Sequence, residues 1–109
     1  MTIGQLTKGY VKENLDKKIT LSDISWHLHC STVTITEHFK REYGITVMEY
    51  VMHKRMRKAE QMLYNSELPI KDISEACGFP NMEYFSRSFK SVHGMSPRAW
   101  RQEKLKGEQ

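Results

Sequence analysis

The sequence repeats itself at a nearly fixed offset, and this feature constrains the fold more than any other. The stretch Leu21 to Ser25 (LSDIS) aligns with Ile70 to Ser74 (IKDIS) at an offset of 49 residues. One extra residue in the second copy then shifts the offset to 50. The pairs at this offset are Ile35 with Phe85, Thr36 with Ser86, Phe39 with Phe89, Lys40 with Lys90, Gly44 with Gly94, Thr46 with Ser96 and Tyr50 with Trp100. The alignment predicts two copies of one structural unit.

The second copy, Ile70 to Arg101, has the pattern of a helix-turn-helix. Apolar residues recur at helical spacing on both sides of Gly78, which predicts two helices that each bury one face. Glycine suits the turn because it adopts a positive φ without steric cost. The residues expected in the core are Ile70, Ile73 and Cys77 before the turn, and Tyr84, Phe85, Phe89 and Val92 after it.

The first copy contains signals for three helices. A first helix is expected over Gln5 to Lys17, with an apolar stripe. Thr20 offers an oxygen that can cap a second helix, with Asp23 in the reciprocal position of a capping box. Ser31 can cap a third helix that runs to about Tyr43. The residues predicted to face this core are Leu6, Tyr10, Val11 and Leu15, then Leu21, Ile24 and Leu28, then Ile35 and Phe39.

A long helix between the copies is predicted from Val47 to Asn65, since this stretch contains no Pro or Gly and has a wide apolar face. We interpret this helix as a rigid spacer. Its expected core face is Met48, Val51, Met52, Met56, Ala59, Met62 and Leu63, and its charged face is His53, Lys54, Arg55, Arg57 and Lys58. A last helix is expected from Ser96-Pro97 through Trp100. The prediction is an all-α fold with a first helix-turn-helix subdomain at 1–46, a linker helix at 47–65 and a second subdomain at 66–109.

Charge is distributed unevenly along the 109 residues. Residues 1–52 contain six basic and six acidic side chains, whereas 53–109 contain eleven and seven, so the net charge of +4 comes from the second half. Such a balance is compatible with a polyanionic partner. The two cysteines, Cys30 and Cys77, are interpreted as small core residues rather than a disulfide framework. No apolar stretch is long enough for a membrane span and no signal peptide is recognisable, so a cytoplasmic location without membrane contact is expected.

Two motifs resemble the signature of the AraC/XylS family of bacterial transcription regulators. They are G-F-x(4)-Y-F-S-R-S-F-K at Gly78 to Lys90 and G-M-S-P-R-A-W-R at Gly94 to Arg101. The first copy is similar, with S-x(3)-I-x(3)-F-K-R-E-x-G from Ser31 to Gly44, and Arg55 and Ala59 match an R-x(3)-A pair. The resemblance implies about seven helices in two helix-turn-helix subdomains. It also implies that a recognition helix from each subdomain enters successive major-groove segments of double-stranded promoter DNA.

The family's base-reading positions fall on Val33, Thr36 and Glu37 in the first copy, and on Met82, Glu83, Ser86 and Arg87 in the second. Arg87 could pair with guanine O6 and N7, or it could form an ion pair with Glu83 one helical turn away. Glu37 departs from the family, which commonly has a basic or polar side chain there. Its carboxylate can accept from cytosine N4 but repels phosphate, and the alternative is a solvated surface residue.

Phosphate contacts are expected from basic side chains and from helix N-termini, where free backbone N–H groups favour anions. For each lysine the alternative is a solvated surface charge. The expected contacts are Ser31, Lys40, Arg41, Lys54, Asn81 and Lys90.

Other clusters have simpler interpretations. The seven methionines are read as core filler, and no cofactor is predicted. His27, His29, Cys30 and His38 match no common zinc spacing, so no metal site is predicted, and His29 aligns with Gly78 as a turn residue. Trp26 aligns with Glu75 and its helical phase points outward. It either folds down over Leu28 or marks a contact surface.

Three classes of function follow from these features. A sequence-specific DNA-binding regulator accounts for the repeat, the charge asymmetry and the family motifs together. A protein-interaction module on the same fold is the alternative, and an enzyme is disfavoured because no phosphate loop, nucleophile elbow or metal spacing is present. We expect a domain that is monomeric in isolation and acts as the output end of a longer regulator with a fused sensor or receiver domain. RNA polymerase is a further expected partner.

Overall fold

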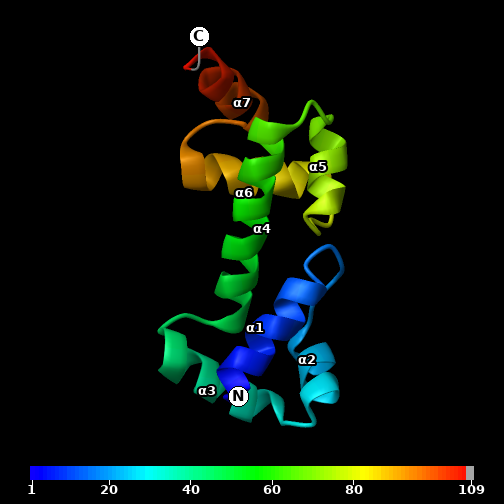
Figure 1. Ribbon diagram of the computed structural model, residues 1–109, viewed down its shortest axis with the longest axis vertical. Helices are drawn as coiled ribbons and strands as arrows, with labels where there is room; N and C mark the ends of the chain where they lie inside the picture. Colours follow the sequence, from blue (N-terminus) through cyan, green and yellow to red (C-terminus); the bar gives the residue numbers. More distant parts are fainter. Residues whose placement is uncertain (108–109) are drawn as a thin grey trace. The chain divides into compact units, whose positions relative to one another are not determined.

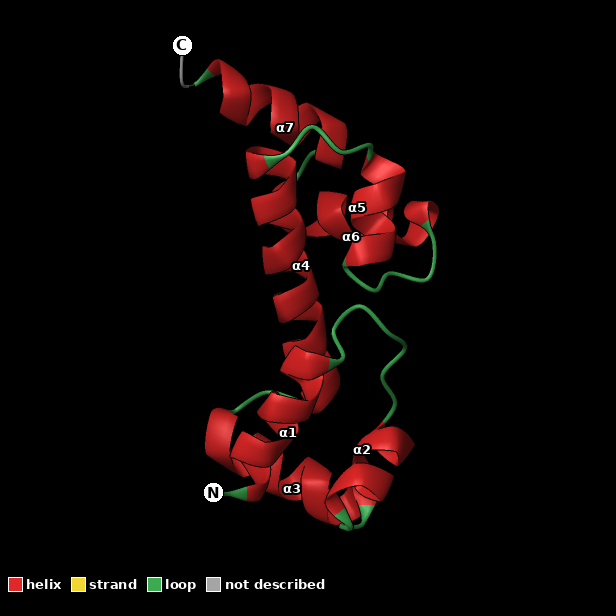
Figure 2. Cartoon of the chain, turned by 45° about the vertical axis from the view of Figure 1, so that its right-hand side comes forward, coloured by secondary structure: helices red, strands yellow, loops and turns green. Residues whose placement is uncertain are grey.

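The computed structural model describes residues 1–107, which form seven α-helices and contain no strand (Figures 1 and 2). The all-α prediction is confirmed. The helices are α1 Ile3–Glu13, α2 Leu21–Leu28, α3 Thr32–Tyr43, α4 Val47–Asn65, α5 Ile70–Ala76, α6 Met82–His93 and α7 Pro97–Lys106.

The chain forms two compact units, Met1–Lys54 and Arg55–Gln109. The boundary lies inside α4, so the first part of this helix belongs to the first unit and the rest to the second. In the first unit α1 packs against α2 and α3, and in the second unit α6 packs against α5 and α7. Each unit therefore has its own core.

The core of the first unit is aliphatic around one aromatic ring. Phe39 is fully buried and makes edge contacts with Tyr43 and Tyr50 at centroid distances of 4.8 and 5.5 Å. α1 comes close to α3 because Gly4 has no side chain: a Cβ there would collide with Glu42 and Tyr43. The buried apolar residues are Val11, Ile19, Ile24, Ile35, Phe39, Val47 and Val51.

The core of the second unit is richer in aromatic rings. Phe85 lies 4.7 Å from Phe79 and 5.8 Å from Phe89, and Phe89 meets Trp100 edge-on at 5.6 Å. Tilted and edge-on arrangements are those that aromatic quadrupoles favour. The thiol of Cys77 is buried in this core, and burial raises its pKa to about 11. Both cysteines are free, in agreement with the sequence.

The structure reproduces the repeat. α3 and α6 each have 12 residues and end at a glycine in the left-handed region, Gly44 with φ 77° and Gly94 with φ 76°. Tyr50 and Trp100 occupy equivalent places against Phe39 and Phe89. The aligned pairs of the sequence are therefore equivalent in three dimensions.

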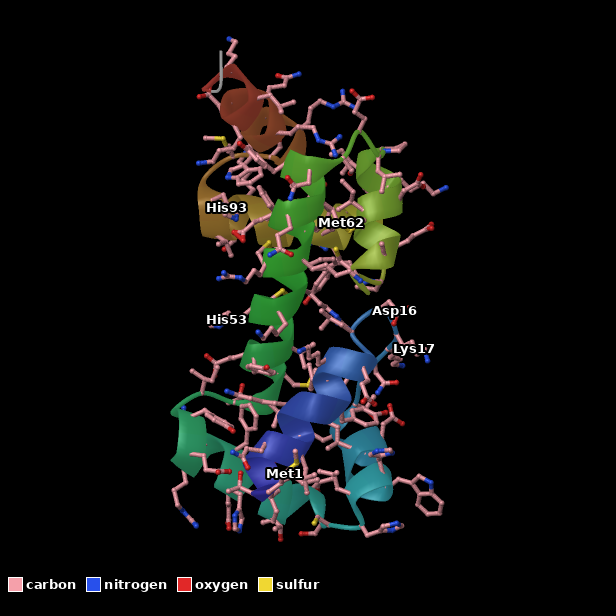
Figure 3. All side chains as sticks on the ribbon, in the orientation of Figure 1. Met1, Asp16, Lys17, His53, Met62 and His93 are labelled. Carbon is pink, nitrogen blue, oxygen red and sulfur yellow. The ribbon has the colours of Figure 1, made fainter. Side chains whose placement is uncertain are left out.

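The repeat also extends to the helix at the start of each unit, although the sequence alone does not reveal this. At an offset of 52, α1 corresponds to the second part of α4, so buried Thr7 matches buried Ala59 and Val11 matches Leu63. The equivalence holds although the side chains differ. Lys8 Nζ lies 3.5 Å from the ring centre of Tyr43. The equivalent residue Glu60 contacts His93, with 3.0 Å between Oε1 and Nε2 (His93 is labelled in Figure 3).

The first helix differs from its predicted bounds of Gln5 to Lys17. It begins at Ile3 because Thr2 and Gln5 form a reciprocal capping box, and it ends at Glu13 because the Asn14 side chain donates to the Tyr10 carbonyl. A polar residue that bonds its own backbone competes with helix continuation.

Four side chains predicted in the cores are exposed instead. Helical spacing places a residue on a face but does not say how far the neighbouring helix reaches over that face. The four are Leu6 (40% exposed), Met48 (43%), Tyr84 (39%) and Val92 (62%). Among the described residues, no helix combines the length and apolarity that crossing a bilayer requires.

The two interhelical turns use the same backbone conformation with different residues. Gly78 has φ 81° and His29, its aligned partner, has φ 57°. A left-handed conformation costs a residue with a Cβ about 1–2 kcal/mol, which glycine avoids. The prediction that His29 is a turn residue is confirmed, and the first turn contains local strain that the second lacks.

We therefore expect Gly78→Ala to lower the free energy of unfolding by about 1–2 kcal/mol, because alanine must adopt the positive φ. His29→Gly should change it little, because relief of strain is offset by greater unfolded-state entropy. Urea unfolding followed by circular dichroism measures both. Gly9→Ala, inside α1 with open space around the new Cβ, is a control that should stabilise. Full tolerance of Gly78→Ala would contradict the assigned turn.

Candidate nucleic-acid interface

Each unit contains a helix-turn-helix, α2 with α3 and α5 with α6. A serine side chain ties each turn to the helix before it: Ser25 Oγ donates to the Cys30 carbonyl, and Ser74 Oγ donates to the Asn81 carbonyl at 3.3 Å. In the second unit, Lys58 Nζ also donates to the Ala76 carbonyl at the end of α5, at 2.8 Å. These bonds fix the angle at which the second helix of each motif leaves the turn.

Side chains cap the N-termini of α3 and α6. Ser31 Oγ accepts from the Thr34 amide at 3.1 Å, and Asn81 Oδ1 accepts from the Tyr84 amide at 2.7 Å. Both caps are exposed. The capping role predicted for Ser31 is confirmed, and Asn81 plays the same role in the second unit.

The outward face of α3 carries the predicted residues of the first copy. Val33 is 63% exposed, and Thr36 and Glu37 are exposed beside it, while Ile35 and Phe39 are fully buried on the opposite face. Lys40 and Arg41 are exposed in the last turn of the helix. The face can therefore offer an apolar contact, a hydroxyl and a carboxylate.

The outward face of α6 has a different chemistry. Met82 is 42% exposed, Glu83 and Arg87 are exposed, and Ser86 is partly covered. Glu83 and Arg87 are one turn apart, but no ion pair joins them in the described part of the chain. The guanidinium of Arg87 is therefore available to a ligand.

Two further basic side chains belong to the predicted phosphate contacts. Lys54 is exposed, with its Nζ 5.6 Å from the ring centre of Tyr50, and Lys90 is exposed in the last turn of α6. Lys54 belongs to the first unit and Lys90 to the second.

One histidine near the first turn packs against an aromatic ring. His27 lies 5.0 Å from Tyr10 ring to ring, and the Cys30 thiol donates to the Leu28 carbonyl. Within residues 1–107, no three His, Cys, Asp or Glu side chains are placed to hold a metal ion.

Comparison with known proteins assigns this arrangement to a family. A sequence model of the helix-turn-helix domain matches residues 24–103, which is most of the chain. The chain belongs to the AraC-type helix-turn-helix family of transcription regulators. Over 92 residues it is 32% identical to the probable transcriptional regulator LumQ of Photobacterium leiognathi, covering 84% of this chain and 37% of LumQ. The chain thus spans little more than a third of the length of this relative.

Solved structures of AraC-type domains have the same fold. The C-terminal domain of AraT, a response regulator from Geobacillus stearothermophilus, superposes with a TM-score of 0.90 and 31% identity, covering 94% of this chain and 86% of that one. The DNA-binding domain of AdpA, solved in complex with a target DNA, has a TM-score of 0.84 at 18% identity, covering 93% and 90% of the two chains, and this likeness shows the fold alone. The AraC-type fold and family place the chain among transcription regulators rather than enzymes.

Several residues that shape this AraC-type domain were not found from the sequence. Buried Ser74 and the Lys58 contact with α5 have no signal in a periodic pattern, because both depend on a carbonyl brought near by the fold. Arg101 donates from Nε to the Leu63 carbonyl and from Nη1 to the Leu68 carbonyl, across more than 30 residues. Arg101 is the last residue of the second family motif, but the motif does not indicate which groups this side chain binds.

Replacing either cap should destabilise its helix. We expect Ser31→Ala and Asn81→Ala each to lower the free energy of unfolding by about 1 kcal/mol, since a first-turn amide loses its acceptor. Thermal and urea unfolding measure the change. Asn81→Asp is the matched variant, because aspartate caps equally well and should restore stability. Equal stability of all three variants and the wild-type domain would mean that the caps contribute nothing.

Proposed function

We propose that this AraC-type domain binds double-stranded DNA in a sequence-specific manner and regulates transcription, with α3 and α6 as recognition helices in successive major-groove segments. The observation that carries the proposal is the equivalence of α3 and α6: two capped helices of 12 residues, each with a buried apolar face that includes a phenylalanine and an exposed polar face. An α-helix of this kind fits the major groove, where base edges are distinguishable.

In α6 we assign Arg87 as the principal reader, because arginine can make paired hydrogen bonds to guanine O6 and N7. Glu83 precedes it by one turn and can accept from cytosine N4 on a neighbouring pair. Ser86 and Met82 complete the base-reading set as a hydroxyl and an apolar contact. The exposure of Arg87 and the absence of an ion pair with Glu83 among described residues support this assignment.

In α3 the proposed readers are Val33, Thr36 and Glu37. Val33 can touch a thymine methyl group and Glu37 can accept from cytosine N4, but a carboxylate also repels the phosphates on both sides of the groove. We infer that the second unit anchors the domain on DNA and that the first unit adjusts the preference for sequence.

The proposed phosphate contacts lie around both helices. Each basic side chain that neutralises a phosphate releases condensed counterions, so together they make binding strongly dependent on salt. The set is Ser31, Lys40 and Arg41 on α3, Lys54 on α4, and Asn81 and Lys90 on α6.

The domain is proposed to be the output end of a longer, cytoplasmic regulator. The length of LumQ and the response-regulator context of the AraT domain support this architecture. We propose that the isolated domain is monomeric, because two readers on one chain can recognise an asymmetric site without a second copy. A fused sensor or receiver domain and RNA polymerase are the proposed protein partners.

Substitutions in the two readers test the division of roles. Using fluorescence anisotropy with a duplex selected from random sequence, we expect Arg87→Ala to weaken binding by about 10-fold to 100-fold, since a paired guanine contact is lost. Thr36→Ala should have a smaller effect. Arg87→Lys is the matched control, because it keeps the charge but loses the paired geometry.

Unchanged specific affinity of Arg87→Ala would overturn the assignment of Arg87. Equal losses for Arg87→Ala and Thr36→Ala would contradict the anchoring role of the second unit while leaving DNA binding itself intact.

A further inference from the structure

A groove in the first unit, between α2 and the start of α3, has no part in the proposed base reading. Its volume is about 390 Å³, and Ser22, Trp26, His29, Ser31 and Thr32 line it. Trp26 is 85% exposed, so it has not folded down over Leu28. Its indole ring is therefore accessible to a ligand that enters the groove.

Several side chains that line the groove can donate hydrogen bonds. Three of its side chains already donate hydrogen bonds within the unit, namely Ser25, Cys30 and Ser31. In the described part of the chain, the hydroxyls of Ser22 and Thr32 and the indole N–H of Trp26 have no such bond. No acidic side chain lines the groove. Its chemistry therefore suits an acceptor that carries negative charge.

The equivalent groove in the second unit has the opposite character. It lies between α5 and the start of α6 with a volume of about 300 Å³, and its lining includes Lys71 and the carboxylates Glu75 and Glu83. Glu75 occupies the aligned place of Trp26. Asn81, a proposed phosphate contact, also lines this second groove, so a phosphate there would lie near two carboxylates, whereas no carboxylate lines the first groove. The two grooves thus differ in the charge of their lining side chains.

We propose that the Trp26 groove binds the sugar–phosphate backbone of DNA beside the site of α3. The indole ring packs on a deoxyribose and its N–H donates to a phosphate oxygen, with the Ser22 and Thr32 hydroxyls as further donors. The groove is continuous with the proposed DNA face, because Ser31 belongs to both. The contact gives the first unit backbone affinity that offsets the repulsion by Glu37. This inference rests on the proposed function.

Shielding of Trp26 is the direct test. The domain has two tryptophans, and the other, Trp100, packs against Phe89 in the second core. Acrylamide should quench the emission of the free domain strongly through Trp26, and saturating DNA should remove that accessible fraction. Trp26→Phe is the matched control, since its remaining emission comes from Trp100 and should not respond to DNA. Unchanged quenching of the wild-type domain on DNA would overturn the proposal.

Affinity provides the second readout. We expect Trp26→Ala to weaken binding to the selected duplex by about tenfold while leaving the preferred bases unchanged, because the backbone is the same for every sequence. Glu75→Gln in the equivalent groove should leave affinity unchanged or slightly tighter. Wild-type affinity of Trp26→Ala refutes the groove contact alone, whereas a wild-type domain that binds no duplex refutes the proposed function.

Discussion

The packing of one phenylalanine in each unit determines how the rest of the domain can work. Phe39 and Phe89 are fully buried and are held edge-on by Tyr50 and Trp100 from the helix that follows. Ile35 and Phe85, one turn earlier, are buried on the same side. Truncation of such a phenylalanine to alanine typically costs about 3–5 kcal/mol. Because this seam fixes the rotation of α3 and α6 about their axes, it also decides which side chains face outward.

The elements with local signals could be predicted from the sequence almost to the residue. Thr20, Ser31, Gly44 and Thr46 mark the ends of α2, α3 and α4 through caps and positive φ, which depend only on neighbouring residues. The exposure of Val92 and Leu6 could not be predicted, since it depends on how far another helix extends. The hydrogen bonds from Arg101 to the Leu63 and Leu68 carbonyls could not be predicted either, because they join residues that are far apart in the sequence.

The candidate site shows the same division between local and long-range information. Helical periodicity placed Thr36, Glu37 and Arg87 on outward faces because the period is local. Whether Arg87 pairs with Glu83 depends on side-chain rotamers, and the sequence left both alternatives open. The structure decides in favour of an unpaired guanidinium among the described residues. Trp26 was ambiguous from sequence for the same reason, and its exposure became clear only with the fold.

The two copies of the repeat carry unequal chemistry on the helices proposed to read DNA. Both copies have the buried phenylalanine, the helix caps and the closing glycine. They differ at the exposed positions proposed to contact DNA, where Glu37 aligns with Arg87 and Trp26 aligns with Glu75. Selection of bound duplexes from a random DNA pool tests this account most directly. We predict that the enriched site is asymmetric and has two conserved segments about one helical turn apart. One segment should show the stronger preference, which is for guanine, and Arg87→Ala should abolish that preference. Enrichment of a palindrome, of one segment only, or of no sequence would contradict it.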